Sequence, residues 1–474
     1  MENTLTEDLR SNIKRVFDAQ KSNQLAVKLA PINDRKAKLK KLKTAIKARE
    51  NEIFEALKKD LRKPVFESAV FEVLFTYAEI DFAVSNIALW TTPQTAPSNL
   101  VNLMTKCRIR YEPKGVCLII APWNYPFQLL ISPLISAIAA GNCCILKPSE
   151  LAPATSSVLA ILIKETFREE EIAVIEGNVS VSTELLSLPF NHIFFTGSTK
   201  VGKVVMEAAS KNLSTVTLEL GGKSPAIIDA DSDLRMAADK ITWGTFANAG
   251  QTCIAPDYVF VHEDQHDKFI ELMKENIEKK YFLKGQLNKE DYGKIISDSH
   301  FIRLKNMMQD AVEKGGQIKI GGTSEEADRT IYPTVLTNVS LDSLIMKEEV
   351  FGPVLPVLKY KKMTEVVDHV NANDKPLALY VFSNSERNVE TILKQTSSGG
   401  ACINDVMIHI SNPHLSFGGV NASGIGGSHG FHGFKSFSHE RSVMYQSKML
   451  DIGKIVYPPY KGKGFILKLL RKLM

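Results

Sequence analysis

Short apolar segments alternate with helical patterns between residues 116 and 219, and this alternation constrains the fold more than any other feature of the sequence. Strands connected through helices form a parallel, doubly wound sheet. The pattern recurs after Gly222, and at 474 residues the chain is longer than one hydrophobic core supports. We therefore predict an α/β fold with two doubly wound parallel-sheet domains. The expected strands are 116–121, 143–146, 173–175, 193–196 and 216–218, then 226–228, 258–261, 334–336, 354–358 and 378–382.

Several polar residues follow the predicted strands of the first domain. Ligands of doubly wound sheets bind in the crevice beyond the carboxyl ends of the strands. Lys147, Gly197 and Glu219 all fall at such ends. After Glu219, two glycines at 221 and 222 carry no side chain that could block an approaching ligand. Glu219 is therefore a candidate base that faces a crevice.

Cys253 ends the run GQTC (250–253), which follows a segment with apolar residues at helical spacing. Gly250 is suited to end that helix, so Cys253 is expected on a constrained turn. A cysteine attacks a carbonyl as its thiolate, and the resulting thioester needs a positioned base to activate water. Cys253 and Glu219 could fill these two roles. The alternative is that Cys253 is only a small buried apolar side chain.

Asn124 lies in the run APWNYPF (121–127), directly after an apolar stretch that is typical of a buried strand. Attack on a carbonyl creates an oxyanion, which an asparagine amide and a backbone N–H can stabilise. We assign this role to Asn124. The alternative is an asparagine that only caps a turn between two prolines.

Seven motifs follow one another along the chain: WNYP (123–126), KPSE (147–150), FTGS (195–198), ELGGKSP (219–225), GQTC (250–253), EVFGP (349–353) and the glycine-rich segment 417–427. In this order they resemble the aldehyde dehydrogenase superfamily, most nearly its class 3 or fatty-aldehyde branch. We accordingly divide the chain into a cofactor-binding domain, 1–221, interrupted by an oligomerisation segment near 86–111, and a catalytic domain, 222–404. Residues 405–450 are expected to return to a small β oligomerisation arm. In relatives this arm reaches a partner subunit, so the resemblance implies a homodimer.

The resemblance also implies a dinucleotide cofactor. The turn and helix start with Gly197, Ser198 and Gly202 would take the pyrophosphate, although these residues alone fit an ordinary tight turn. Lys147 could reach the ribose hydroxyls and Glu150 could accept a hydrogen bond from the 2′-hydroxyl. An acid at this position disfavours a 2′-phosphate, so we expect NAD over NADP, although class 3 relatives with this run can use both. The alternative for this pair is a surface salt bridge.

In the second domain, Glu349 and Phe351 are the implied cofactor residues. The carboxylate would hold the nicotinamide ribose, and the ring would border the nicotinamide. From the residues alone, a glutamate before a turn is usually solvated.

The implied reaction is oxidation of an aldehyde to the carboxylic acid with reduction of NAD or NADP. Cys253 attacks, Asn124 and the Cys253 backbone N–H hold the oxyanion, and Glu219 activates the water that hydrolyses the thioester. Glu349 could share the role of base. Two alternatives stay open: a CoA-acylating aldehyde dehydrogenase, and a catalytically retired relative with a binding or structural role.

The expected substrates are medium or long aliphatic aldehydes, or aromatic ones. This expectation rests on the class 3 resemblance and on an apolar-leaning loop with Met407, Ile408 and Ile410. The expected walls of the substrate pocket are the helix through Phe71, Phe75 and Tyr77, together with Ile254 and the loop 409–415.

Composition excludes several other classes of protein. A net charge of +5 on 474 residues gives no reason to expect a nucleic-acid partner. The six cysteines lie mostly in apolar runs without metal-ligand spacing, and five histidines between 409 and 439 match no zinc pattern, so we expect no metal. We expect no apolar stretch long enough to cross a bilayer, and a cytoplasmic protein.

Residues 451–474 are expected to form a basic amphipathic tail. Its apolar residues can share one helical face, with Lys468, Arg471 and Lys472 opposite or flanking. Such a helix can lie on an anionic membrane as a peripheral contact. The alternative is packing on the partner subunit or on the body of the protein. The apolar residues are Phe465, Ile466, Leu469, Leu470 and Leu473.

Overall fold

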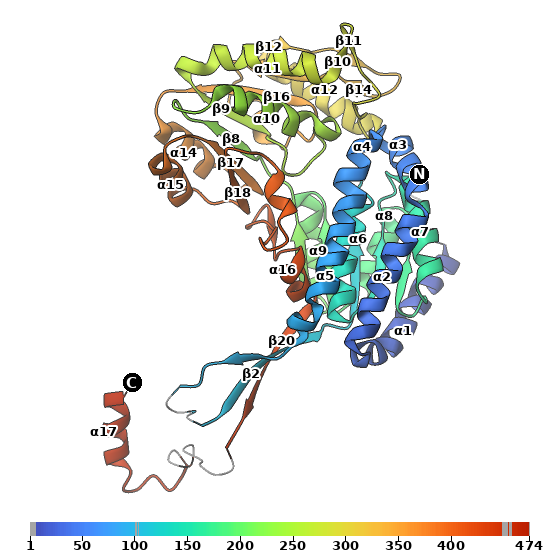
Figure 1. Ribbon diagram of the computed structural model, residues 1–474, viewed down its shortest axis with the longest axis vertical. Coiled ribbons are helices and arrows are strands. Elements are labelled where there is room, and N and C mark those ends of the chain that lie inside the picture. Colours follow the sequence, from blue (N-terminus) through green and yellow to red (C-terminus); the bar gives the residue numbers. More distant parts are fainter. Residues whose placement is uncertain (1–5, 100–101, 103, 448–453, 455–456, 474) are drawn as a thin grey trace.

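The computed structural model describes residues 6–99, 102, 104–447, 454 and 457–473. Two α/β units lie one above the other, and a narrow β arm extends from the lower unit toward the C-terminal helix (Figure 1). The α/β fold with two parallel sheets and an arm, predicted from the sequence, is confirmed.

The first sheet has the strand order β19-β7-β6-β3-β4-β5. All five strands expected here are present, and neighbours among them run parallel. The sixth strand, β19 (Gly424–Ile425), was not expected from the sequence; it pairs antiparallel with β7 and places Gly424 opposite Glu219. The expected strands are β3 (Val116–Ile120), β4 (Cys143–Lys147), β5 (Ile172–Val174), β6 (His192–Thr196) and β7 (Thr215–Glu219).

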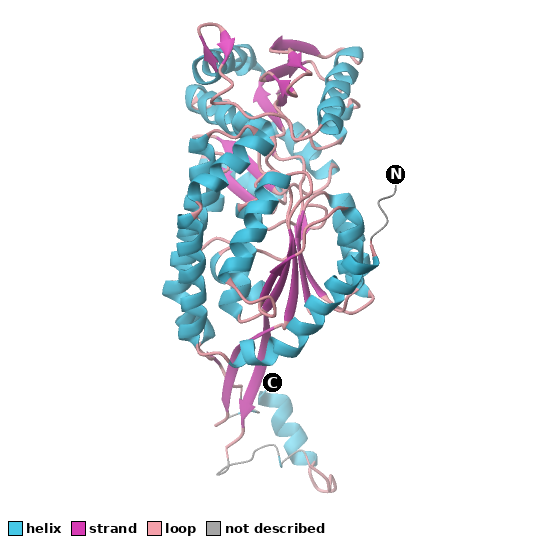
Figure 2. Ribbon diagram, turned by 90° about the vertical axis from the view of Figure 1, so that its right-hand side faces the viewer, coloured by secondary structure: helices cyan, strands magenta, loops and turns pink. Residues whose placement is uncertain are grey.

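Helices cover both faces of this sheet (Figure 2). Successive side chains of a strand point to opposite faces, so Leu118 and Ile145 pack in one apolar cluster while Ile119 and Leu146 pack in the other. The cluster with Leu118 is covered by α1 (Glu7–Leu29), α8 (Val179–Ser187) and α9 (Thr199–Ser210). The opposite cluster is covered by α2 (Ile32–Ala48), α3 (Glu50–Leu61), α5 (Phe75–Thr91), α6 (Gln128–Ala140), α7 (Pro153–Thr166) and α16 (Gly430–Ser436).

The second sheet has seven strands in the order β12-β15-β16-β9-β8-β17-β18. The five expected strands form its parallel centre. Its edges, β12 (Gln317–Ile320) and β18 (Gly400–Ile403), were not expected, and β12 runs antiparallel. Helices α10 (Leu234–Phe246), α11 (His266–Tyr281), α12 (Asp298–Glu313), α14 (Met363–Ala372) and α15 (Glu386–Gln395) pack around the sheet. The central strands are β8 (Pro225–Ile228), β9 (Tyr258–His262), β15 (Thr334–Thr337), β16 (Val354–Tyr360) and β17 (Ala378–Phe382).

One continuous helix is longer and more apolar than the sequence analysis allowed. It joins α4 (Val65–Ser68), a π-helical turn η1 (Ala69–Leu74) and α5. Among the described residues, this Val65–Thr91 segment is the one helix long and apolar enough to cross a membrane. The expectation of no such stretch is wrong by that measure. In the fold, α5 packs against α2, α6 and α16, which explains its apolar composition.

The arm is a three-stranded antiparallel sheet in the order β1-β2-β20. Its strands are β1 (Gln94–Ala96), β2 (Lys106–Pro113) and β20 (Ser438–Tyr445). The domain boundaries stay a prediction. Within the described residues of the part assigned to the arm, 405–447, only β20 pairs with arm strands, whereas β19 belongs to the first sheet and α16 covers its face.

Candidate active site

Cys253 follows helix α10 and a tight turn, as the sequence predicted. The turn η3 (Ala247–Gly250) puts three successive residues in the left-handed region, with φ of 51° at Asn248, 51° at Ala249 and 72° at Gly250. For an alanine this conformation costs roughly 1–2 kcal/mol. At Gly250 a Cβ atom would lie 2.3 Å from the Gly352 carbonyl oxygen, so only glycine fits. The turn therefore holds the chain against the loop that carries Glu349.

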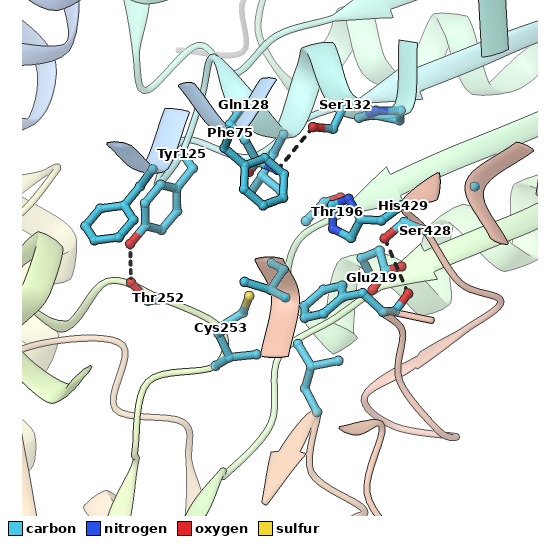
Figure 3. A pocket seen from close by; sticks show the side chains of 18 of the residues that line it. Phe75, Tyr125, Gln128, Ser132, Thr196, Glu219, Thr252, Cys253, Ser428 and His429 are labelled. Atoms are coloured by element: carbon cyan, nitrogen blue, oxygen red, sulfur yellow. Dashed lines mark hydrogen bonds between the residues drawn. The ribbon is translucent and has the colours of Figure 1, made fainter. Parts of the chain in front are cut away.

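The Cys253 side chain faces a cavity of about 100 Å³ beside the end of the first sheet (Figure 3). Of the expected walls, Phe71, Phe75, Ile254 and Ile410 line it. Tyr77 does not, because its ring packs under Lys43 and Lys47 of α2. The polar side chains along the cavity are Gln128, Ser132, Ser136, Thr196, Glu219, Thr252, Ser428 and His429, and further apolar walls come from Leu129, Phe194, Leu377, Met407 and Phe417.

Glu219 lines the same cavity from the carboxyl end of β7. The residue is 5% exposed, and among the described residues no group meets hydrogen-bond geometry with either carboxylate oxygen. Burial raises the pKa of Glu219 to about 8, and the nearby Ser428 hydroxyl opposes this rise. A carboxyl with this pKa can release and regain a proton near neutral pH, as a general base must.

The surroundings of the Cys253 thiol disfavour its ionised form. Burial raises its pKa to about 12, helped by Glu349 and Glu219 when these are ionised and opposed by the backbone N–H groups of Cys253 and Ile254. Those two N–H groups point toward the sulfur and are suited to stabilise negative charge on or beside it. Activation of the thiol therefore needs neighbouring carboxyls that are protonated or positive charge brought into the site.

Asn124 lies in the loop between β3 and α6 and is 3% exposed. Its Nδ2 donates to the backbone carbonyl of Gln251 at 3.0 Å, two residues before Cys253. The backbone carbonyl of Asn124 accepts from Lys63 Nζ and from Asn248 Nδ2, each at 3.0 Å. Asn124 is thus hydrogen-bonded to the turn 247–253 that ends in Cys253, which we call the nucleophile turn. A simple cap between prolines would not require these bonds. The Asn124 side chain does not line the cavity itself.

The expected pyrophosphate residues meet at the carboxyl end of β6. Ser198 is the N-cap of α9, and its hydroxyl accepts from Val201 N at 3.4 Å. Gly202 is buried, and a Cβ there would lie 2.7 Å from Leu220, so the glycine lets α9 pack closely on the strand end. Gly197 opens the turn. The free N–H groups at the start of α9 fit an anionic pyrophosphate.

Lys147 and Glu150 lie together after β4. The ammonium is 2% exposed and 2.6 Å from the Glu150 carboxylate, which is 35% exposed. The salt bridge that was the alternative for this pair is therefore present, with the lysine buried and the Glu150 carboxylate partly exposed to solvent. A nearly buried lysine beside the strand ends also fits a polyhydroxylated ligand in the crevice.

Glu349 reaches across from the second unit to the glycines after β7. A Cβ on Gly221 would lie 2.0 Å from its Oε2 atom, so the glycine makes room for this carboxylate. Burial and the neighbouring Asp257 raise the pKa of Glu349 to about 8. Phe351 has φ of 48° and stacks edge-to-face on Trp123, with ring centroids 5.2 Å apart.

Sequence reasoning missed the residues that hold this second loop. Val350 N donates to Asp257 at 2.7 Å, and Arg303 donates to the carbonyls of Glu349 and Val350 at 3.1 and 2.5 Å. Lys223 forms an ion pair with Asp257. Lys223 stands in a quoted motif, but nothing in the sequence indicates that its partner is 34 positions away.

The site combines a thiol on a constrained turn, a buried carboxyl and a helix start beside a parallel sheet. This combination is typical of a dehydrogenase that uses a nicotinamide dinucleotide and a cysteine nucleophile. The model of the aldehyde dehydrogenase family matches residues 4–443, and the chain belongs to this family. The resemblance found in the sequence is confirmed.

Similar proteins include the 4,4'-diaponeurosporen-aldehyde dehydrogenase of Staphylococcus aureus, 45% identical over 92% of this chain and 94% of that protein. Aldehyde dehydrogenase family 3 member A2 of Macaca fascicularis is 43% identical over 93% and 91% of the two chains. The solved structure described as the substrate-bound state of Staphylococcus aureus AldH superposes with a TM-score of 0.92 at 43% identity, covering 97% of this chain and 99% of that one. The chain is accordingly an enzyme for NAD(P)-dependent aldehyde oxidation.

Proposed function

We propose that this enzyme oxidises medium or long apolar aldehydes, aliphatic or aromatic, to carboxylic acids through Cys253. The observation that carries the proposal is a thiol and an unpartnered carboxyl on one cavity whose walls are mostly aromatic and aliphatic. An apolar cavity of this kind favours apolar chains because burial of each CH₂ group contributes about 0.8 kcal/mol.

In the proposed mechanism, the Cys253 thiolate attacks the aldehyde carbon. The Asn124 amide and the Cys253 backbone N–H donate to the oxyanion that forms. A nicotinamide held beside Cys253 would supply the hydride acceptor for the oxidation, and Cys253 would then carry the acyl group as a thioester. Glu219 then takes a proton from the water molecule that attacks the thioester. The carbon–sulfur bond breaks, the acid is released, and the departing Cys253 thiolate can regain the proton from Glu219. Glu349 can reach the same region and is the second candidate for proton transfer.

The cofactor residues are assigned on the same footing. Gly197, Ser198 and Gly202 would take the pyrophosphate at the start of α9. Lys147 and Glu150 would hold the adenosine ribose, and the Glu150 carboxylate favours NAD because it repels a 2′-phosphate. In the second unit, Glu349 and Phe351 would border the nicotinamide ribose and ring.

The experiment is NADH formation by the wild type and Cys253→Ala with aldehydes of increasing chain length, with and without CoA. The expected result is CoA-independent turnover that rises with chain length and is lost in the variant. Turnover only with CoA would assign the acylating reaction. Cofactor binding without turnover on any aldehyde would indicate a retired relative, and activity of Cys253→Ala would refute the nucleophile.

We infer that the protein forms a homodimer through the arm. β1 and β20 are the edges of the arm sheet, and unpaired edge strands with exposed apolar side chains are prone to pair with another chain. Met444 and Tyr445 at the end of β20 are 53% and 46% exposed. Light scattering should give twice the chain mass of 52.6 kDa. A stable monomer at micromolar concentration would contradict the assignment.

We further propose a cytoplasmic enzyme whose C-terminal helix α17 (Gly464–Leu473) makes a peripheral membrane contact. Phe465 and Leu467 on this helix are 70% and 59% exposed, and Lys468 and Arg471 lie on the same helix. Exposed apolar groups with nearby cations suit an anionic lipid surface. Co-sedimentation with anionic liposomes should capture the full chain but not a variant that ends at Tyr457. Equal behaviour of the two would refute the contact and favour packing on protein.

A further inference from the structure

A buried ion pair lies outside the residues assigned so far. Lys63 follows α3, Glu72 lies in the π-helical turn η1, and both side chains are 0% exposed. Removing two charges from water costs several kcal/mol for each ion, and the pair recovers this only if further hydrogen bonds satisfy the remaining polar atoms. The partners of those atoms therefore indicate what the pair holds in place.

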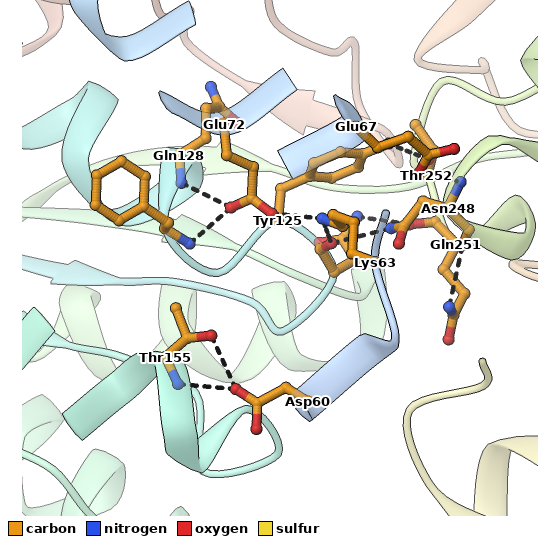
Figure 4. Close-up of polar contacts among 12 residues, drawn as sticks. Asp60, Lys63, Glu67, Glu72, Tyr125, Gln128, Thr155, Asn248, Gln251 and Thr252 are labelled. Atoms are coloured by element: carbon orange, nitrogen blue, oxygen red, sulfur yellow. Dashed lines mark hydrogen bonds and ion pairs between the residues drawn. The ribbon is translucent and has the colours of Figure 1, made fainter. Parts of the chain in front are cut away.

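The second oxygen of Glu72 accepts from two backbone N–H groups, Phe127 N at 2.9 Å and Gln128 N at 3.1 Å. These groups open helix α6, where N–H groups have no partner within the helix. The π-helical turn inserts an extra residue into the helix, and such turns often place a side chain at a functional site. Glu72 thus fixes the far end of the loop that begins at Asn124 (Figure 4).

Lys63 fixes the near end of the same loop. Its Nζ donates to the Asn124 carbonyl at 3.0 Å and lies 4.1 Å from the centre of the Tyr125 ring. The ammonium therefore contacts Glu72, Asn124 and Tyr125 together, and the loop 124–128 is held from both ends by one ion pair.

The loop is in turn bonded to the nucleophile turn. Besides the bond from Asn124 to Gln251, the Asn248 amide donates to the Asn124 carbonyl, and the Tyr125 hydroxyl is 2.8 Å from that of Thr252. A displacement of the loop by 1 Å would move the proposed oxyanion donor relative to the sulfur, and such displacements can cost about 100-fold in rate.

We propose that the Lys63–Glu72 pair positions Asn124 for the acylation half of the reaction. Both are positioning residues that act through Asn124, and neither touches the substrate. The inference rests on the proposed function, in which Asn124 donates to the oxyanion. The position of the Asn124 amide is then set by a charge pair from the segment 63–72, which lies outside both sheets.

The test measures the pre-steady-state burst of NADH with saturating aldehyde in Lys63→Met and Glu72→Gln. The burst rate should fall by roughly 10- to 100-fold, while the KM for NAD changes by less than about threefold. Lys38→Met is the matched control, because Lys38 pairs with Glu171 at 3.0 Å in the same unit away from the site. It should leave the burst rate unchanged. If Lys63→Met does not fold, Glu72→Gln serves alone, since it keeps the side-chain shape and one acceptor oxygen.

A double-mutant cycle separates positioning from general stability. In an Asn124→Ala background, Glu72→Gln should lower the burst rate by less than about twofold, while the loss in melting temperature persists in both backgrounds. An equal fall of the burst rate in both backgrounds would overturn the positioning role and leave the function of Asn124 intact. If Asn124→Ala alone leaves the burst rate unchanged, the oxyanion role fails and the positioning role fails with it.

Discussion

The nucleophile turn and the proposed base differ in how their polar atoms are held. Around Cys253, the side-chain amides of Asn124, Asn248 and Gln251 each donate to a backbone carbonyl of another of these three residues. Across the cavity, both oxygens of Glu219 are buried, and no described residue meets hydrogen-bond geometry with them, although the Ser428 hydroxyl lies nearby. The first region is tied together by hydrogen bonds, while the Glu219 carboxyl is not held in this way.

This difference fits the two halves of the proposed reaction. An oxyanion donor works best when it is fixed before the charge forms, because no reorganisation is then needed. A general base has to release and accept a proton, so strong bonds to its charged form would lower its pKa below a useful range. The absence of partners on Glu219 is therefore consistent with its role, although it destabilises the fold.

The largest expected effect is that of Glu219→Gln. Without the base, thioester hydrolysis should slow by roughly 10²- to 10⁴-fold, while acylation proceeds. The variant should therefore show a burst of about one NADH per active site followed by very slow turnover. The measurement is rapid-mixing absorbance of NADH with trapping of the thioester by mass spectrometry.

Glu349→Gln is the control for this experiment, because its carboxyl also has a pKa of about 8. If Glu349 serves only the cofactor, its variant should weaken hydride transfer and show no accumulation of thioester. A thioester that accumulates in both variants would mean that the two carboxyls share the base role.

Asn124→Ala should have the next largest effect, on the opposite half-reaction. Removal of one oxyanion donor costs roughly 10²- to 10³-fold in kcat. Here the NADH burst itself should be slow, and no thioester should accumulate. Burst rates of wild type and variant at saturating NAD measure this, and an unchanged burst with slow hydrolysis would reverse the assignment of the two regions.

The sequence predicted the central strands of both sheets and the place of Cys253, because each depends on local signals: apolar β-branched runs, and a helix that ends in glycine. It could not predict β19, a two-residue strand in a glycine-rich segment that pairs with β7 from more than 200 positions away. No local pattern marks such a strand, because its partner is fixed only by the tertiary fold.

The sequence predicted the residues of the site less completely than the strands of the sheets. Lys63 and Glu72 carry charges, which normally indicate an exposed position, and only the fold shows that their partners are backbone groups of 124–128. Tyr77 was expected to line the pocket, yet it stands two positions after Phe75, and residues two apart on a helix do not share a face. The helical period could have excluded it.

The rate of thioester hydrolysis should depend on pH through Glu219. The active form of the base is the carboxylate, and the pKa of Glu219 is about 8. The hydrolysis rate should rise about tenfold between pH 6 and 7, rise further to pH 8, and level off above it. Stopped-flow hydrolysis of the preformed thioester across this range gives the profile. In Glu219→Gln the profile should be flat, and a rise that persists there would assign the titration to another group.

The smallest expected effect is on stability, and it has opposite signs in the two regions. Asn124→Ala should lower the melting temperature by a similar amount at every pH, because it leaves the buried Gln251 carbonyl without this donor.

Glu219 affects stability in a way that depends on pH. Its pKa rises from 4.5 when unfolded to about 8 in the fold, so the folded state retains a proton that the unfolded state releases, and stability falls as the pH rises between these values.

Glutamine cannot ionise and avoids this loss. Glu219→Gln should therefore match the wild type near pH 4.5, gain on it through the window to pH 8, and be more stable by up to a few kcal/mol at pH 9. Thermal unfolding of both variants at pH 5, 7 and 9 makes the comparison. A gain that is independent of pH would show that the Glu219 carboxyl is solvated or paired in solution, and the contrast between a bonded nucleophile turn and an unbonded base would then be lost.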